Sequence, residues 1–488
     1  MGAGEDGSMI SILDDVYKRL RGSNNLVFAN SKSLVERAAD YLRRKSEEQR
    51  APNEFFPHHG NLSRDFREDA EERLRENEIP STVICTTTLE MGIDIGSIAS
   101  VAQIGAPPST ASLRQRMGRS GRAGGPAILR IYVQEREIDP MTPPQDTLRP
   151  ELFQSVAMVS LLLKKWLEPP RSSSLGFSTL IQQTLSIIAE RGGIQAGGAW
   201  KDLCGPGPFS GVSQSTYAKL LRVMGEKDLL LQAGDGVLLP GALGERIINH
   251  FSFYVIFPTP EEYRILSSGR LLGSIPIDRP ISAGGMLIFA GKRWRIDSID
   301  DRKREIAVNP AKGGRPPKFC GSAGSIHGAV RKEMFELYRG QEIPAYLDPM
   351  AAELLLEGRK SFIELGLEKE NAVKWGENTL LFPWSGDMEL DSLCALLKTE
   401  GIMVSHDGIA VEMESISIPG AYAAIKRILD RGPVDAIAIA RRVVNKSQEK
   451  YDSFLSEELL CMDYASRYLD IPAAMSLLRS IYFGSPGR

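Results

Sequence analysis

The sequence predicts a parallel α/β domain, followed by a mostly helical region and then by a region of short strands and further helices. Three observations lead to this prediction. Over the first ~130 residues, short apolar strands alternate with helices, a pattern typical of a parallel sheet. Residues 151–245 show mainly helical periodicity. Over residues 246–325, short strands are separated by Gly, Pro and Asp turns, and helices dominate after Ser325.

The first domain is expected over residues 1–140. Ser31, Ser63 and Ser109 each precede a helical segment, where a helix N-cap is expected. The expected strands lie at residues 26–29, 54–57, 82–86, 98–104 and 127–133. Ligands of open parallel sheets bind at the carboxyl ends of the strands, so we expect the chemistry at that edge. The Pro-rich segment at 140–150 breaks the alternation and marks the first boundary.

A second domain is expected over residues 151–245. Apolar helices are predicted at 154–166, 178–193 and 215–226, and two strands then flank the turn Gly234-Asp235-Gly236. Helices followed by a small hairpin resemble a winged helix. That fold often contacts nucleic acid, and it also serves as a scaffold or a protein-contact module.

The remaining residues, 246–488, are expected to form a third unit. Its first part, about 250–325, contains the runs HFSFYVIF, GMLIFAGKRWRIDSID and REIAVNP, which predict a small β-barrel or a strongly bent sheet. The rest is expected to be helical, with an α/β piece around residues 378–397.

Composition supports a globular chain of about three domains at roughly 100–200 residues each. The 59 Lys and Arg residues nearly balance the 62 Asp and Glu residues, so a nucleic-acid surface must be a local patch. No apolar run approaches ~18 residues, so no membrane partner is expected. Without a targeting signal, the default expectation is a cytoplasmic protein. The five cysteines are scattered without a CxxC pair, and no metal site is expected.

The most specific motif is QRMGRSGR, which runs from Gln115 to Arg122. Arg119 and Arg122 are three residues apart at the predicted edge of a sheet, where both could reach one phosphate group. A guanidinium group is always charged and binds oxyanions with a planar fork, and such groups stabilise the charge that develops in phosphoryl transfer. We therefore predict Arg119, Arg122 and Gln115 as catalytic residues. The competing interpretation is an exposed basic turn.

This segment resembles motif VI (QxxGRxGR) of superfamily-2 helicases. The segment CTTTLEMGID, at the end of a predicted strand, looks like motif V of the same superfamily. The resemblance implies that Thr86 binds a phosphate of the nucleic-acid strand and that Asp94 accepts from the ribose hydroxyl of ATP. Gly92 and Gly118 would allow the backbone to approach the nucleotide closely. Taken singly, Thr and Asp residues at such positions are more often helix caps.

Two further segments extend the resemblance. The run NLVFANSKS, which includes Ser31, resembles motif IV. The sequence His58-His59-Gly60, followed by Leu62-Ser63-Arg64, resembles the HHGxLS segment that contacts nucleic acid in this superfamily. Paired histidines alone are usually surface residues, but four segments in the right order make coincidence improbable.

Longer stretches are similar to the large helicase-related (Lhr) family, from about residue 25 to 470. They include LEMGIDIGSIASVAQIGAPPS, FQSVAMVSLLLKKWLEPP, STLIQQTLSIIAERGG, FYVIFPTPEEYRIL and EKYDSFLSEELLCMDYASRYLD. This resemblance implies a second RecA-like (P-loop NTPase-type) domain, a winged helix, and a C-terminal domain of a β-barrel with helices. It also implies an ATP- and Mg²⁺-dependent motor that moves 3′ to 5′ on single-stranded DNA and unwinds duplexes. DNA repair is the pathway expected for the family, and phage defence stays open as an alternative. Single-stranded DNA or a DNA/RNA hybrid would be the partner.

The sequence departs from the family pattern in one respect. It contains neither GxxxxGK[ST], whose amides and Lys hold phosphates, nor DExH. ATP and Mg²⁺ are therefore expected only together with a first RecA-like domain, supplied in cis or in trans, and the chain alone should not hydrolyse ATP. Three interpretations stay open: a fragment of a longer helicase, one half of a split helicase, or a non-catalytic nucleic-acid-binding protein.

Two more residues are nucleic-acid candidates outside these motifs. Trp294 lies in GKRWRI between basic residues and could stack on a base, although a barrel-core Trp fits the same pattern slightly better. Arg315, with Lys312 and Lys318, lies in NPAKGGRPPKF and could clamp a phosphate; an ordinary solvated loop is about equally compatible.

Overall fold

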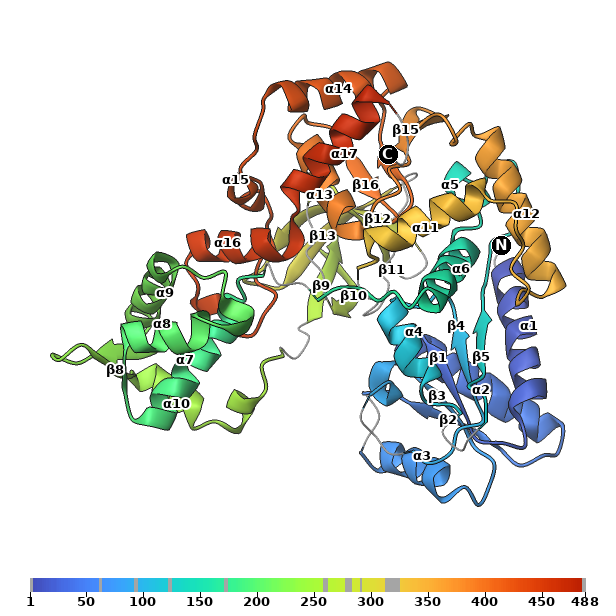
Figure 1. The fold of residues 1–488 in the computed structure, drawn as a ribbon, viewed down its shortest axis with the longest axis horizontal. Helices are drawn as coiled ribbons and strands as arrows, with labels where there is room; N and C mark the ends of the chain where they lie inside the picture. The colour runs from blue at the N-terminus through green and yellow to red at the C-terminus, as the bar shows by residue number, and fades with distance from the viewer. Residues whose placement is uncertain are drawn as a thin grey trace.

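The computed structural model describes residues 3–60, 64–91, 95–121, 125–170, 174–257, 262–276, 283–289, 292–311 and 325–484 (Figure 1). Within these ranges, no helix has the length and the apolar character needed to cross a membrane.

The amino-terminal domain is built on a five-stranded sheet, and all its strands are parallel. The strands are β1 (Asn25–Ala29), β2 (Phe55–His58), β3 (Thr82–Cys85), β4 (Ser100–Ile104) and β5 (Leu129–Tyr132), in the order β2-β3-β1-β4-β5. Helices α1 (Ala3–Leu20) and α2 (Lys32–Glu48) pack on one face, and α3 (Arg64–Glu76) packs on the other. Because both faces are covered, β1, β3 and β4 are buried along their whole length. The parallel α/β prediction is confirmed.

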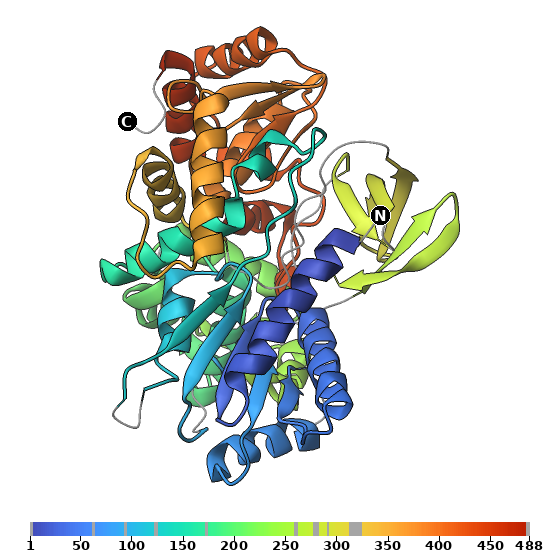
Figure 2. The same ribbon diagram turned by 90° about the vertical axis from the view of Figure 1, so that its right-hand side faces the viewer.

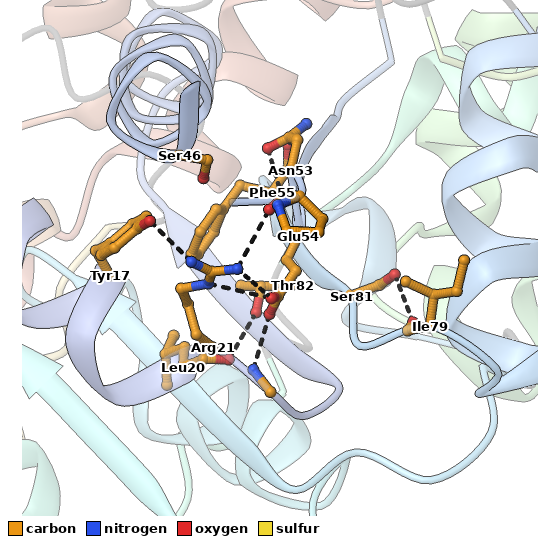
Figure 3. A network of polar contacts seen from close by, with 12 residues as sticks. Tyr17, Leu20, Arg21, Ser46, Asn53, Glu54, Phe55, Ile79, Ser81 and Thr82 are labelled. Atoms are coloured by element: carbon orange, nitrogen blue, oxygen red, sulfur yellow. Dashed lines mark hydrogen bonds and ion pairs between the residues drawn. The ribbon is translucent and has the colours of Figure 1, made fainter. Parts of the chain in front are cut away.

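Helix α1 was not predicted, because its start, MGAGEDGSMI, reads as an acidic, Gly-rich segment. Its buried residues, Leu13, Val16, Tyr17 and Leu20, nevertheless follow the spacing of one helix face. The helix is tied to the amino-terminal edge of the sheet by the residue that follows it. Figure 3 shows the Arg21 guanidinium between Tyr17 and Glu54: it donates to the Tyr17 hydroxyl at 2.9 Å and to Glu54 Oε1 at 2.7 and 3.1 Å.

Residues 177–248 form three helices, α7 to α9, a small antiparallel sheet of order β6-β8-β7 and a short fourth helix, α10. The elements are α7 (Phe177–Arg191), β6 (Ile194–Gln195), α8 (Ala196–Cys204), α9 (Gln214–Glu226), β7 (Leu230–Gln232), β8 (Val237–Pro240) and α10 (Ala242–Ile248). Their apolar core includes Leu180, Leu185 and Leu220. The predicted hairpin around Gly234–Gly236 is present as β7 and β8. We refer to this part as the three-helix region.

Helix α6 (Pro150–Leu163), which follows the short α5 (Pro144–Thr147), departs from the expected domain boundaries. It packs against α11 (Gly328–Arg339) and α12 (Pro349–Glu364). The ring of Phe153 stacks on that of Tyr338 with their centroids 3.7 Å apart. The expected unit 151–245 therefore begins with a helix whose packing partners lie about 180 residues further along the chain. Apolar periodicity identified the helix but could not identify those partners.

Residues 262–310 contain a five-stranded sheet of order β10-β9-β13-β12-β11, which Figure 2 shows standing at one side of the molecule. The strands are β9 (Glu262–Ser267), β10 (Arg270–Pro276), β11 (Met286–Phe289), β12 (Lys292–Asp300) and β13 (Glu305–Pro310). All pairs are antiparallel except β9 with β13. Among the described residues, β10 and β11 are the edge strands of this sheet and do not pair with each other. Closure of the sheet into a barrel therefore stays a prediction.

The carboxyl-terminal part contains a four-stranded antiparallel sheet of order β14-β15-β17-β16 with helices around it. Its elements are β14 (Ala372–Trp375), β15 (Asn378–Leu381), α13 (Asp387–Lys398), β16 (Val404–His406), β17 (Val411–Met413), α14 (Ile418–Asp430), α15 (Ala436–Ala440), α16 (Glu457–Tyr468) and α17 (Ile471–Phe483). The expected α/β piece corresponds to β15 and α13. Tyr451, Leu455 and Leu459 complete the core of the three-helix region, so α16 packs directly against it (Figure 1).

Candidate functional site

The segments resembling motifs V and VI meet at the carboxyl edge of the parallel sheet. Strand β3 ends at Cys85 and leads through a short 3₁₀ turn to Glu90. Strand β4 leads to α4 (Thr110–Met117), whose N-cap is Ser109, and the motif VI segment covers the end of this helix. Both segments therefore lie at the carboxyl ends of the strands, the edge at which open parallel sheets bind ligands.

A buried ion pair joins the two segments. Arg116 donates from Nε and Nη2 to Glu90 Oε2 at 3.0 and 2.8 Å, and Ser112 Oγ donates to Glu90 Oε1 at 2.5 Å. The third guanidinium nitrogen, Nη1, donates to Gln103 Oε1, and the guanidinium carbon lies 4.7 Å from the centre of the Phe28 ring. Arg116 is only 2% exposed. Buried charges persist where they are paired and hydrogen-bonded, and this pair meets that condition.

Arg119 is anchored to the same residue through the backbone. Its Nε and Nη2 donate to the carbonyl oxygen of Glu90 at 3.2 and 2.8 Å, and the side chain is 7% exposed. Glu90 therefore holds Arg116 through its carboxylate and Arg119 through its carbonyl. Arg122, Gly92 and Asp94, which were predicted to act with Arg119, lie outside the described residues.

The remaining motif VI residues have different surroundings. Gln115 is exposed on α4, and Gly118 closes this helix with its N–H donating to the Arg114 carbonyl at 3.0 Å. Gly121 has a φ of +77°, and a Cβ there would lie 2.8 Å from the Ala127 nitrogen. Only glycine fits that position, so Gly121 fixes the path of the loop after Arg119.

The predicted nucleic-acid contacts lie at the same edge. Ser31 Oγ accepts from the Leu34 N–H at 3.1 Å and so caps α2, as its sequence position suggested. Thr86 is half-buried, and its N–H donates to the His58 carbonyl at 3.4 Å. His59 is 5% exposed, which leaves little of its ring for contact with a nucleic acid in this conformation.

Sequence reasoning missed three residues that shape this edge: Glu90, Arg116 and His58. The His58 ring is buried between Thr88 Oγ, 2.8 Å from Nδ1, and Glu71 Oε1, 3.0 Å from Nε2. It thereby connects α3 with the turn that follows Thr86. All three lie within the quoted motif segments, but residue spacing does not reveal which charged groups become buried.

Cys85 also lies at this edge, directly before Thr86. Complete burial raises the pKa of its thiol well above the usual range. The thiol therefore stays protonated near neutral pH and is not suited to act as a nucleophile.

Trp294, a candidate outside the motifs, is not part of this edge. Trp294 is 9% exposed and packs with Ile265, Ile296 and Val308 in the core of the five-stranded sheet. This position favours the core interpretation of Trp294 over base stacking. Its exposed neighbour Arg295 pairs with Glu414 at 3.1 Å. Arg315 lies outside the described residues.

Comparison with known proteins agrees with the geometry. Residues 8–124 match the helicase conserved C-terminal domain. The chain is 38% identical over 331 residues to the ATP-dependent helicase Lhr-Core of Sulfolobus acidocaldarius, covering 62% of this chain and 34% of that protein. It is 27% identical over 339 residues to the Lhr-Core helicase of Saccharolobus solfataricus, covering 64% and 35%. The chain is thus similar to helicases of the Lhr type, and its amino-terminal domain matches the helicase conserved C-terminal domain.

The Lhr fold extends over nearly the whole chain. The structure of the Mycobacterium smegmatis helicase Lhr bound to ssDNA and AMP-PNP matches with a TM-score of 0.62 at 17% identity. The match covers 97% of this chain and 65% of that one. At this identity the likeness concerns the fold alone, and the amino-terminal sheet that matches the helicase C-terminal domain has the RecA-like α/β fold. The chain spans about a third of the length of the two Lhr-Core relatives.

Proposed function

We propose that this chain supplies the second RecA-like domain and the accessory domains of an ATP-dependent 3′–5′ DNA helicase. The observation that carries the proposal is the anchoring of motifs V and VI on one residue: Glu90 holds Arg116 through its carboxylate and Arg119 through its carbonyl. The match to the helicase conserved C-terminal domain and the similarity to an Lhr-Core helicase support the helicase assignment. ATP dependence, direction of movement and participation in DNA repair are parts of this proposal.

The proposed chemistry assigns Arg119, together with Arg122, to the γ-phosphate of ATP. A preorganised guanidinium stabilises the charge that develops on the transferred phosphoryl group. Gln115, Gly118, Gly92 and Asp94 would complete the nucleotide contacts of this domain. The carbonyl of Glu90 occupies two of the Arg119 donors, which fixes the orientation of the guanidinium plane.

The triphosphate and Mg²⁺ would be held by a first RecA-like domain, because GxxxxGK[ST] and DExH are absent from the printed sequence. Mg²⁺ would neutralise phosphate charge there. That domain would act in cis or in trans. We expect the 488-residue chain alone to show no ATPase activity.

The nucleic-acid track is proposed to run along Thr86, Ser31 and His59 toward the three-helix region, which we assign as a winged helix from its element order. Single-stranded DNA or a DNA/RNA hybrid is the proposed partner. The solved Lhr helicase of similar fold is bound to ssDNA, which supports this choice. A cytoplasmic location is also part of the proposal.

The test combines this chain with a first RecA-like domain of an Lhr helicase and measures ATP hydrolysis with and without single-stranded DNA. The combination should gain DNA-stimulated activity. Arg119→Ala should lower kcat by about 10³-fold, because an arginine that stabilises the phosphoryl transition state contributes at least that much. Single-stranded DNA binding should not change.

The matched control is Arg114→Ala, which removes an exposed cation from the same helix and should leave kcat near the unaltered value. An unchanged rate for Arg119→Ala would contradict the assignment of Arg119. A combination that binds DNA but never hydrolyses ATP would favour a non-catalytic nucleic-acid-binding protein.

A further inference from the structure

The amino-terminal end of α4, the helix that leads to Arg119, is completed by a residue from another part of the chain. An α-helix leaves its first N–H groups without partners inside the helix. In α4, the Thr110 N–H donates to Glu168 Oε1 at 2.7 Å and the Ala111 N–H donates to Glu168 Oε2 at 2.9 Å. The third N–H, that of Ser112, donates to Ser109 Oγ at 3.0 Å. Glu168 therefore binds two of the three groups, and it does so with both carboxylate oxygens.

Glu168 is located in the segment that leaves α6 and runs toward the three-helix region. This segment is fastened to α11. Lys164 Nζ lies 2.6 Å from Glu333 Oε1, and Ser160 Oγ donates to the same oxygen at 2.6 Å. The ring of Trp166 lies 5.3 Å from that of His327, the N-cap of α11. The position of Glu168 is thus set by the carboxyl-terminal part of the molecule.

Other contacts join the same two parts. Glu151 Oε2, on α6, accepts from the Ala106 N–H at 3.3 Å in the loop before α4. Leu113 of α4 lies in the apolar core that α6 shares with α11 and α12. Figure 1 shows α6 between α4 and α11. The motif VI helix therefore contacts the accessory part along one side and at its amino-terminal end.

A movement of the amino-terminal end of α4 also moves the arginines at its other end. It has eight residues and is about 12 Å long at 1.5 Å per residue. Arg116 occupies its last turn, and Arg119 follows directly. Since a short hydrogen-bonded helix moves as a rigid piece, a displacement of Thr110 and Ala111 moves the arginines as well.

We propose that Glu168 is a positioning residue that couples the accessory domains to motif VI. This inference rests on the proposed helicase function and adds a route for regulation. When nucleic acid moves the part of the molecule that carries α11 relative to the RecA-like domain, the segment carrying Glu168 moves with it and shifts α4. Nucleic-acid binding to the accessory domains thereby changes the position of Arg119 at the ATP site.

A purely local alternative is that Glu168 only caps a helix. Ser109 provides the matched comparison, because it caps the same helix from within the RecA-like domain. Ser109→Ala weakens α4 without touching the connection to α11. Glu168→Ala weakens α4 and also removes the connection. Helix stability therefore affects both variants, and coupling affects only the second.

The experiment uses this chain assembled with a first RecA-like domain and measures the factor by which a single-stranded oligonucleotide stimulates ATP hydrolysis. We expect Glu168→Ala to lower the stimulation factor about five- to tenfold, the size of a modest coupling between two sites. The DNA-free rate and the KM for ATP should stay near those of the unaltered protein. Ser109→Ala should keep the stimulation factor. Glu190→Ala, an exposed carboxylate at the end of α7, should change nothing.

Glu168→Gln adds a second readout. Its amide can accept through only one oxygen and places a donor against the other N–H group of α4. It should therefore lower stimulation as Glu168→Ala does, although the side chain keeps its size. Equal stimulation in the Ser109 and Glu168 variants would overturn the coupling and leave a helix cap. If the unaltered assembly shows no DNA-stimulated hydrolysis, the proposed function fails, and that outcome is separate from any effect of Glu168.

Discussion

The first N–H groups of helices α4 and α7 are each bound by a carboxylate from a distant segment, but the two carboxylates lie in different environments. Glu168 accepts from the Thr110 and Ala111 N–H groups of α4, across 58 and 57 residues of sequence. Asp463 accepts from the Phe177 N–H of α7 at 3.0 Å, across 286 residues. In both helices a carboxylate from a distant segment therefore binds the amino-terminal end, where the helix dipole favours negative charge.

The two carboxylates have different environments. Asp463 is 3% exposed, and burial raises the pKa of its carboxyl. Arg467 Nε lies 2.9 Å from its Oδ2, and the neighbouring Leu175 N–H donates to Ser466 Oγ at 3.0 Å. Glu168 is half-buried and is followed by two exposed prolines. We interpret the α7 contact as a fixed joint and the α4 contact as one that can open at low cost.

The largest expected effect comes from Asp463→Ala. It removes the acceptor of the Phe177 N–H and one of the two carboxylate partners of Arg467, which is half-buried. A broken pair that is fully buried costs about 3–5 kcal/mol, and the loss here should approach the lower value. Hydrogen exchange followed by mass spectrometry should show that loss as faster exchange in the peptides of α7 and α16.

The control on the same helix is Glu458→Ala. Glu458 is exposed and pairs with Lys219 of α9 at 2.7 Å. Such an exposed pair contributes little to stability because solvent screens it, so protection should change little. Similar losses for the Asp463 and Glu458 variants would remove the distinction between a fixed joint and a surface contact.

The next effect is a pH dependence at the same joint. Burial raises the pKa of Asp452 from 3.8 to about 6, although its Oδ2 accepts from the Gln448 and Glu449 N–H groups, both at 2.8 Å. Between the two pKa values the folded state binds more protons than the unfolded state. Stability therefore falls as pH rises from about 4 to about 6, by about 2–3 kcal/mol at 1.36 kcal/mol per pKa unit.

Asp452→Asn isolates this contribution. The amide has the shape of the protonated acid and keeps an oxygen to accept the two N–H groups. Exchange protection of α7 and α16 in the variant should exceed that of the unaltered protein near pH 7 and equal it near pH 4. A difference that is constant with pH would show that Asp452 does not titrate in this window.

Local features of the two compared regions were predicted from the sequence, whereas their long-range contacts were not. The parallel sheet, α4 and its N-cap Ser109 were predicted correctly, because strand–helix alternation and capping are local patterns. The hairpin of the three-helix region was predicted from its Gly-Asp-Gly turn. These features depend on residues that are close together in the sequence.

The contacts that complete the site were not predicted. Glu168 and Asp463 bind N–H groups far away in sequence, and nothing in their own segments identifies those partners. Glu90 and Arg116 lie inside recognised motifs, but only the folded structure shows that they are buried as a pair. Long-range pairing of polar groups depends on the packing of whole elements, and residue spacing does not encode it.

The smallest expected effect is the equilibrium cost of Glu168→Ala. Losing a carboxylate that caps a helix on a half-exposed segment costs about 1 kcal/mol. Exchange should quicken in the peptide that contains α4 and stay unchanged in α7, whereas Asp463→Ala should give the reverse. A loss in α4 as large as that in α7 would mean that Glu168 is also a fixed joint. The α4 contact could then not open at low cost, and the movable coupling that we infer for motif VI would need a different hinge.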